Sequence, residues 1–538
     1  MTIKFFTHLK FIGILIVPSL FYGNSYAEVP VSNFLNHDTL PISSLTTLQS
    51  LKGINHKKLY QAPFIHDLKN RHHVRTLFVE THDLPIIDIQ LTFNAGSARD
   101  KEIGKDLLGL SNMVAELMPE GTETLSAQDI ATAFENIGAQ YSIQAYRDMF
   151  IVRLRVLSTS NKLNPAVDMI LEILNNAAFK NHNLNLQLNN MNIGKKQINE
   201  DPNKLLNSQF DRSIYQNHPY ADPITGTVGS LKKINSIELK KFRDQFIVSQ
   251  NMNIAITGDL TAKEATQLAN KISSKLKQGN KAPPLAQPQK VNHFNIQHIP
   301  FNSTQAYISM GHLGTSKDNP DRIALEVANR ILGNSGFNSI LMKELRVKRG
   351  FTYAVNSNVT FRQAAGTFNL SYSTRQDQLL DSIQVAHKIL VDFTQQPIDP
   401  QILEETKMGL LRAFPINYNS NAMINSQLGS IGFYQESADY LNQYQKKLIK
   451  LSAKDVQNAV KKHLHPDQLK LVIVSKELDQ AQLMQILQQN LLPETKLKEL
   501  TIHNIPIINA HHQTSEEIHS PSAVPFEVPS STEDIDQH

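Results

Sequence analysis

The sequence contains no cysteine among its 538 residues. Disulfide bonds, thiolate metal sites and catalysis by a thiol are therefore excluded. An excess of charge of one sign is also missing, because 53 lysines and arginines stand against 49 aspartates and glutamates. Proteins that bind nucleic acid through its phosphates need a clear basic excess, so this balance argues against that class. The length and the 41% hydrophobic content are those of a globular protein with several domains.

Long apolar runs are scarce, and the most prominent one lies at residues 11–21, after Lys4 and Lys10. A small-residue pattern at 25–27 follows it, which is typical of a secretory signal peptide cleaved after Ala27. The run is too short to span a bilayer comfortably. Removing this segment takes away two of the 53 basic residues and leaves 51 against 49 acidic ones. We expect an exported, periplasmic protein without a transmembrane anchor.

Several catalytic motifs are absent as well. No His-Glu-x-x-His and no Gly-x-Ser-x-Gly occurs, so other peptidase and hydrolase classes are not indicated. Gly333 and Gly336 are not followed by Gly-Lys-Ser/Thr and make no phosphate loop. His463 and His465 have no acidic partner of suitable spacing and are predicted to be surface residues. The stretch 511–519 is rich in histidine, but a tail offers no preorganised metal geometry.

The sequence contains an internal repeat. Ser236 and Ser452 begin similar helix-then-strand segments, and the offset between them is 452 − 236 = 216. Gly96 and Gly314 end similar strands, with an offset of 314 − 96 = 218. Two independent anchors that agree within two residues predict two tandem homologous domains, since the period is far longer than a solenoid repeat.

Composition predicts where these domains begin and end. Residues 277–292 are rich in Pro, Gln and Lys without apolar periodicity, as expected for a linker. The last stretch is rich in Ser, Pro and Glu, which is typical of disorder. The predicted organisation is a signal peptide at 1–27, an N-terminal leader at 28–60, a first domain at 61–276, the linker, a second domain at 293–495 and a disordered tail at 496–538.

Each domain mixes strands and helices. Apolar and polar residues alternate over 87–93, the pattern of a sheet with one buried face. Ser126 with Asp129 three residues later predicts a helix start, and Gly138 predicts its end. Strands often follow one another without a crossover helix, which favours an α+β fold with mainly antiparallel sheets flanked by helices.

A helix predicted at 107–118 has the spacing of a metal site without its ligands. Asn112, Ala115 and Glu116 lie three and four residues apart and so share one face. A zinc peptidase places its first ligand, its base and its second ligand at this spacing.

The segment GLSNMVAELMPEGT at 109–122 resembles the Gly-Leu-x-His-x-x-Glu-His-x-x-x-x-Gly-Thr motif of the pitrilysin/insulinase family, which includes mitochondrial processing peptidases. The resemblance covers roughly residues 60–490. It continues through FENIGAQYSI, NEDPNKLL, HPYADPITGT, RILGNSGFNSILMKELRVKRGFTYAV and AAGTFNLSY. It implies a two-domain chain that forms half of a clamshell, with a second such subunit as the other half.

The family binds zinc through two histidines and a distant glutamate, with another glutamate as general base. The resemblance places these roles on Asn112, Glu116, a position near Gly194, and Ala115, respectively. An amide oxygen and one carboxylate cannot make a three-ligand zinc site, and alanine cannot act as a base. We therefore expect no cofactor bound by this chain, with zinc in a partner subunit.

The family's second domain carries an arginine and, seven positions later, a tyrosine that reach the scissile bond from the side opposite the zinc. In this sequence they are Arg346 and Tyr353. Guanidinium and phenol are fixed donors that can hold a substrate carbonyl and a developing oxyanion. The alternative is structural: an arginine that closes a helix and a tyrosine that packs on a sheet.

Three hypotheses remain. The chain is the non-catalytic, Arg/Tyr-bearing subunit of a heterodimeric zinc peptidase that processes or degrades peptides, inactive alone. Alternatively, it is a catalytically inactive protein of the envelope that binds peptides or assembles partners. The third hypothesis, an active peptidase with unorthodox ligands, requires stoichiometric zinc that is lost on Glu116→Ala.

Overall fold

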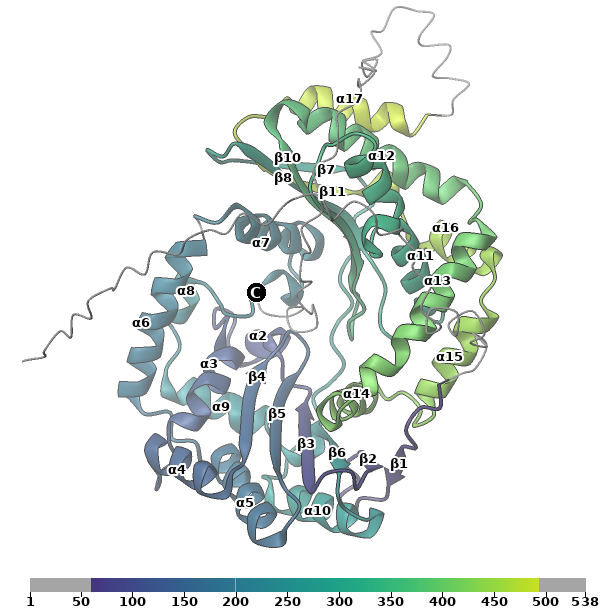
Figure 1. Cartoon of the computed structure of the whole chain (residues 1–538). Helices are drawn as coiled ribbons and strands as arrows, with labels where there is room; N and C mark the ends of the chain where they lie inside the picture. Colours follow the sequence, from purple (N-terminus) through teal and green to yellow (C-terminus); the bar gives the residue numbers. More distant parts are fainter. Residues whose placement is uncertain (1–59, 199, 493–538) are drawn as a thin grey trace, which may run out of the picture. The chain divides into compact units, whose positions relative to one another are not determined.

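A computed structural model describes residues 60–198 and 200–492 (Figure 1). The predicted signal peptide, almost all of the predicted leader and the predicted tail at 496–538 lie outside the described residues. We call the elements from β1 to α10 the first half and those from β7 to α17 the second half.

Two mixed sheets organise the described chain. The first has the order β1-β2-β6-β3-β5-β4 and the second the order β7-β11-β8-β10-β9. The strands are β1 (His66–Leu68), β2 (Thr76–Glu80), β3 (Ile86–Phe93), β4 (Gln140–Ala145), β5 (Phe150–Leu157), β6 (Met252–Gly258), β7 (Asn295–Pro300), β8 (Gln305–Leu313), β9 (Val355–Val359), β10 (Thr367–Arg375) and β11 (Lys470–Ser475).

The two sheets have the same topology. When the edge strand β1 is set aside, the order β2-β6-β3-β5-β4 matches β7-β11-β8-β10-β9 strand for strand. The pairs β2–β6 and β7–β11 are parallel, and the other pairs are antiparallel. The predicted α+β class with two homologous, mainly antiparallel halves is confirmed, and each half adds one parallel pair.

Helices flank both sheets. They are α2 (Asp100–Ile103), α3 (Leu110–Leu117), α4 (Ala127–Ile137), α5 (Ser160–Asn176), α6 (Asn181–Ile198), α7 (Pro202–Tyr215), α8 (Val228–Leu231), α9 (Ser236–Phe246), α10 (Ala262–Lys275), α11 (Arg322–Leu332), α12 (Leu379–Gln395), α13 (Pro400–Ala413), α14 (Asn421–Phe433), α15 (Tyr440–Lys450), α16 (Ala453–His463) and α17 (Gln480–Asn490). Among these described helices, none has the length and apolar character needed to cross a membrane.

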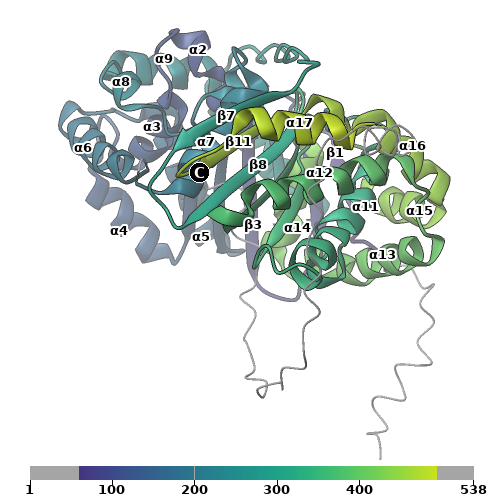
Figure 2. The same ribbon diagram turned by 90° about the horizontal axis from the view of Figure 1, so that it is seen from above.

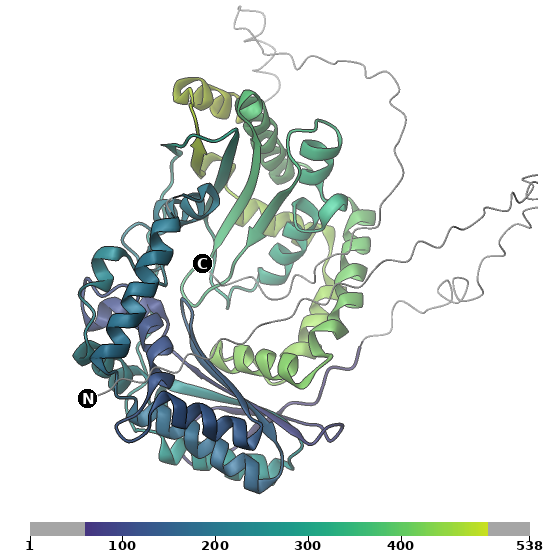
Figure 3. The ribbon, with the colours of Figure 1, turned by 60° about the vertical axis from the view of Figure 1, so that its left-hand side comes forward.

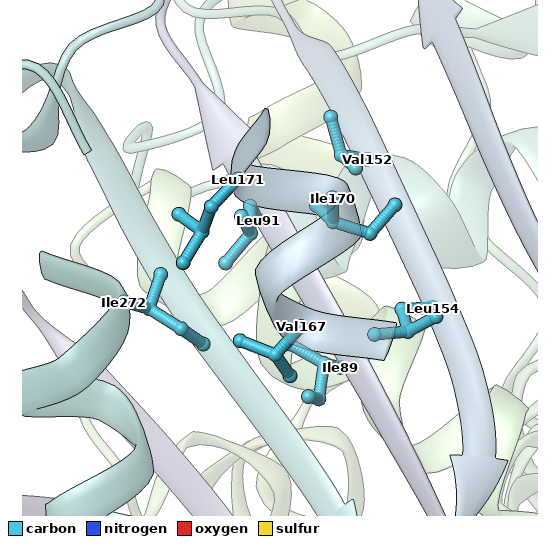
Figure 4. A pocket seen from close by; sticks show the side chains of 8 residues that line it. All are labelled: Ile89, Leu91, Val152, Leu154, Val167, Ile170, Leu171 and Ile272. Atoms are coloured by element: carbon cyan, nitrogen blue, oxygen red, sulfur yellow. The ribbon is translucent and has the colours of Figure 1, made fainter. Parts of the chain in front are cut away.

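The alternating strand β3 builds the core of the first half. Its apolar residues face α5 and α10, and Figure 4 shows how closely these layers pack, with Ile89 and Leu91 opposite Val167 and Ile272. The gap left among these side chains is only about 10 Å³. Burying each such side chain contributes about 1.5–3 kcal/mol, so the sheet is rigidly anchored on this face. In the second half, α12 and α17 contribute to the corresponding core (Figure 2).

Each half supplies one helix to the sheet of the other half (Figure 3). Helix α14 lies on β2, β3 and β6, where Leu428 and Ile431 pack against Val79. Helix α7 lies on β8 and β11, where Phe210 packs with Val472. Neither sheet buries both of its faces without the other half, so the halves depend on one another.

Residues 277–292 contain neither helix nor strand. They are tied to the first half, because Arg99 donates to the carbonyl of Pro283 and His218 Nε2 lies 2.8 Å from the carbonyl oxygen of Ala286. The predicted domain boundaries on either side of this segment stay predictions.

Candidate functional site

Helix α3 begins at Leu110, three residues later than the sequence predicts. Gly109 has φ +89, a left-handed conformation that ends the preceding turn and favours glycine. Glycine has no side chain that could cap the start of the helix. The side chain of Asp100, nine residues earlier in the sequence, caps it instead. Its carboxylate accepts from the backbone N–H of Gly109 at 2.8 Å and of Ser111 at 2.9 Å. Burial raises the pKa of Asp100 to about 7, although these hydrogen bonds oppose the shift.

The four positions that correspond to the family's metal site are not arranged as one exposed face. Ala115 is 3% exposed and belongs to the core, Asn112 is half-buried, and Glu116 is exposed. Gly194 is exposed on α6, which contacts α3. Asn112, Ala115 and Glu116 all lie on α3, so their spacing of three and four residues places them on one side of the helix, but Ala115 is covered by the apolar core.

The donor set does not fit zinc. Of the positions at this place, only Glu116 offers a carboxylate, and its pKa is raised by partial desolvation on α3 and by the neighbouring Glu120 carboxylate. No group of three histidine, aspartate or glutamate side chains in the described part of the chain could hold a metal ion. Zinc chemistry therefore cannot be assigned to α3, whatever a partner subunit carries.

Arg346 lies on a π-helix, Met342–Val347. The backbone N–H of Lys348 donates to the carbonyl of Lys343, five residues earlier, and Phe351 N–H donates to Leu345. Such wide turns are rare and are often found at functional sites, because they redirect a side chain that a regular helix would aim elsewhere.

The Arg346 guanidinium lies over two aromatic rings. Its Cζ is 4.5 Å from the ring centroid of Phe337 and 5.8 Å from that of Tyr353. Phe337 is 59% and Tyr353 84% exposed, so both rings face solvent. The tyrosine therefore does not pack on a sheet as the structural alternative required. Cation–π contacts hold a guanidinium in place without neutralising its charge.

Two neighbouring cations, Lys348 and Arg349, are paired. Lys348 and Arg349 bind Glu344 at 2.6 Å and 2.7 Å, whereas Arg346 forms no ion pair within the described residues. Phe337 was not found from the sequence. Its only signal is an aromatic residue directly after Gly336, whose φ of +58 turns the chain there.

His463 and His465 make contacts within the second half. His463 Nε2 lies 2.8 Å from the carboxylate of Asp321, which also binds Lys462. His465 donates its backbone N–H to His312 Nε2 at 3.1 Å. The prediction that His463 and His465 are surface residues holds only in part, because both are half-buried and the partner of His463, Asp321, is distant in sequence.

Comparison with known proteins agrees with this picture. Residues 75–228 match the insulinase family, peptidase family M16, and residues 233–410 match the peptidase M16 inactive domain. The chain is 24% identical over 426 residues to the non-peptidase homolog YmxG of Helicobacter pylori. The aligned region covers 78% of this chain and 95% of that protein.

Solved structures show the same relationship. A peptidase M16 inactive domain from Pseudomonas fluorescens superposes with a TM-score of 0.73 at 30% identity, covering 77% of this chain and 98% of that one. The periplasmic protease PqqL from Escherichia coli shares the fold with a TM-score of 0.64 at 15% identity, covering 78% of this chain and 47% of PqqL. The protein therefore belongs to peptidase family M16, as an inactive member.

Proposed function

We propose that this chain is the Arg/Tyr-bearing subunit of a heterodimeric M16 peptidase, inactive alone, whose homologous partner carries the zinc motif. One observation carries the proposal. Within the described residues the Arg346 guanidinium has no ion-pair partner and lies over two exposed rings, whereas Lys348 and Arg349 beside it both bind Glu344. A purely structural arginine would be expected to have a carboxylate or carbonyl partner.

The chemistry of this pair suits an acyl-transfer step. A guanidinium and a phenol hydroxyl can donate to the scissile carbonyl and stabilise the negative charge that grows on its oxygen. They need no change of protonation state near neutral pH, since arginine stays protonated. This chain would orient the substrate and stabilise the oxyanion, and the activated water would come from the partner's metal site.

The substrates would be extended peptides or small unfolded proteins. This follows from the closed chamber that two M16 subunits form by the family resemblance, since a folded globular protein would not fit between them. Rapid cleavage of a stable folded protein by the assembled complex would contradict this expectation.

The decisive experiment uses the mature chain and the homologue with His-x-x-Glu-His recovered with it from its own cell envelope. Peptide cleavage is measured for each chain alone, for the mixture, and for mixtures with Arg346→Lys or Tyr353→Phe. We expect cleavage by the mixture alone and a loss of about 100-fold in kcat for each variant, the size typical of one oxyanion donor. Arg349→Lys is the matched control, because that cation is committed to Glu344.

Association must be measured beside activity, for example by size-exclusion chromatography of the same mixtures. Loss of cleavage with retained association would assign Arg346 to the reaction. Full cleavage by the Arg346→Lys/Tyr353→Phe double variant, or the absence of any zinc-bearing partner, would leave the second function: an inactive protein of the envelope that binds peptides or assembles partners.

A periplasmic location completes the proposal. The pattern at residues 1–27 is that of a signal peptide, and PqqL, which shares the fold, is described as a periplasmic protease. Deleting residues 2–27 should move the protein from the periplasmic to the cytoplasmic fraction. An unchanged distribution would contradict export by this segment.

A further inference from the structure

Helices α15 and α16 carry a strongly basic surface. Residues 446–463 contain six lysines but only one acidic residue and no arginine. Outside this stretch, 53 − 6 = 47 basic residues stand against 49 − 1 = 48 acidic ones, so the basic excess of the chain lies entirely here. All six lysine side chains are exposed, and we call them the lysine surface: Lys446, Lys447, Lys450, Lys454, Lys461 and Lys462.

The two helices hold these lysines on the outer side of the second half. Lys446 and Lys450 lie one turn apart on α15. Lys454 and Lys461 lie about two turns apart on α16. The opposite sides of both helices belong to the core of the second half, through Leu448, Val456 and Val460. Only two residues separate the helices in sequence, and both helices lie on the right-hand side of Figure 1 and of Figure 2.

Most of this charge has no counter-charge from the chain. Lys462 binds Asp321 at 2.7 Å, but none of the other five lysines forms an ion pair with any residue that the structure describes. The carboxylate inside the stretch, Asp455, takes part in the capping box at the start of α16. On α13, which packs against α15, Glu404 binds Lys407 and not the lysine surface. The ammonium groups are therefore available to a negatively charged partner.

Helix stability explains only part of this surface. Lysines in the last turn of a helix stabilise its free carbonyl groups, which applies to Lys447, Lys450, Lys461 and Lys462. Lys454, in contrast, lies in the first turn of α16, where the helix dipole disfavours a cation. Ile449 lies among the lysines of α15 and is 38% exposed. A cation at the unfavourable end of a helix and an exposed apolar side chain beside it point to contact with a partner.

We propose that the lysine surface binds the anionic phosphates at the surface of a phospholipid membrane. The lysine ammonium is a point charge on a flexible stem, which adapts to mobile headgroups. The stretch has no arginine, whose planar guanidinium is the residue of choice for the carboxylates of a protein partner. Ile449 adds an apolar side chain that can enter the boundary between headgroups and acyl chains. The inference does not depend on the proposed heterodimer, since all these residues belong to this chain.

The test measures how the mature chain sediments with vesicles of phosphatidylcholine, with and without added phosphatidylglycerol. The variant Lys447→Gln/Lys450→Gln/Lys454→Gln removes three charges from the lysine surface. Thermal unfolding of this variant checks that it is folded, which the exposure of all three side chains leads us to expect.

The matched control removes the same charge elsewhere. Lys232→Gln/Lys263→Gln/Lys281→Gln changes three exposed lysines that lie outside α15 and α16 and form no ion pair within the described residues. The two variants have the same net charge, so a difference between them reports the position of the lysines and not their number.

We expect the native chain and the control variant to bind only the vesicles that contain phosphatidylglycerol. The lysine-surface variant should bind these vesicles about 100-fold more weakly, because each lysine near an anionic membrane raises the affinity roughly fivefold. Raising the salt concentration from about 0.05 M to about 0.5 M should release the native chain, since salt screens exposed charges.

Two results with vesicles would overturn the proposal: equal affinities of the two variants, or equal binding to vesicles of phosphatidylcholine alone. Soluble polyglutamate provides the remaining comparison. If it bound the native chain more tightly than the anionic vesicles do, and lost that affinity in the lysine-surface variant, the partner would be an acidic protein and not a membrane.

Discussion

Asp100 shows how a single residue positions the start of helix α3. Its buried carboxylate accepts hydrogen bonds from two backbone N–H groups at the start of α3, where Gly109 has no side chain that could accept them. The carboxylate lies at the positive end of the helix dipole, which favours its charged form. Burial without a cationic partner acts against that form and raises the pKa to about 7. The balance between these effects can be measured.

The pKa shift predicts a specific pH dependence of stability. The folded chain holds the Asp100 proton up to about pH 7, whereas the unfolded chain releases it near pH 4. The unfolded state therefore binds fewer protons in this interval, and stability falls as pH rises through it, by about 1.4 kcal/mol per unit at most. We expect Asp100→Asn to abolish this decline in urea unfolding measured from about pH 4.5 to about pH 7.5.

The matched control for this prediction is Asp106→Asn. Asp106 is an exposed carboxylate paired with Lys233 at 2.8 Å, and that partner lowers its pKa. Its contribution is already present at the start of the interval, so this variant should leave the slope unchanged. Parallel stability profiles for the native chain and Asp100→Asn would refute the assignment.

Helix α14, which packs on the sheet of the other half, has glycines where it contacts that sheet. A Cβ at Gly432 would lie 2.4 Å from Asn253 Nδ2, and one at Gly429 would lie 2.0 Å from Gln90 Nε2. The helix therefore approaches β3 and β6 more closely than a side chain would permit. Asn253 uses the same proximity to donate to the carbonyl of Gly429 at 3.2 Å.

This close approach predicts opposite effects of the same substitution at two helical glycines. Gly432→Ala should destabilise the protein by about 1–3 kcal/mol, because the short, buried Asn253 side chain must shift. Gly409→Ala on α13 meets nothing within 4 Å and should instead stabilise by about 0.5–1 kcal/mol, since alanine favours the helix. Urea unfolding of both variants measures the difference. A stabilising Gly432→Ala would contradict the packing described for α14.

Local sequence patterns correctly predicted the strands and helices whose formation is determined by residues close together in the sequence. The strand over 87–93 and the helix between Ser126 and Gly138 are present, with the capping box formed by Ser126 and Asp129. Contacts between distant residues were not predictable in the same way. The Asp100 carboxylate caps a helix from nine residues away in sequence, and the Arg346 guanidinium on the π-helix lies over the ring of Phe337, which precedes that helix. The family motif pointed to Arg346 and Tyr353, but not to the Phe337 ring over which the guanidinium lies.

At the scale of the whole molecule, the repeat in the sequence predicted two halves but not how they are joined. The exchange of α7 and α14 is one junction. A second is a buried hydrogen-bond network in which Tyr220 donates to the carboxylate of Asp148. That carboxylate also accepts from Gln363 N–H at 3.1 Å, and Ala364 N–H donates to the tyrosine hydroxyl at 3.2 Å. Two residues of each half thus meet around one buried carboxylate.

This network predicts that Tyr220→Phe is far more costly than an ordinary buried tyrosine substitution. It would leave the Asp148 carboxylate without its hydroxyl donor and the Ala364 N–H without an acceptor, a loss of about 3 kcal/mol or more. Tyr372→Phe is the control, because its hydroxyl only donates to Ser382 at 3.2 Å within the second half and should cost about 1 kcal/mol. Calorimetry should still show one transition for Tyr220→Phe, since the exchanged helices keep the halves interdependent. Equal losses of stability for the two variants would mean that the network does not join the halves energetically. Two separate unfolding transitions for Tyr220→Phe would mean that Tyr220, and not the exchanged helices, couples the unfolding of the two halves.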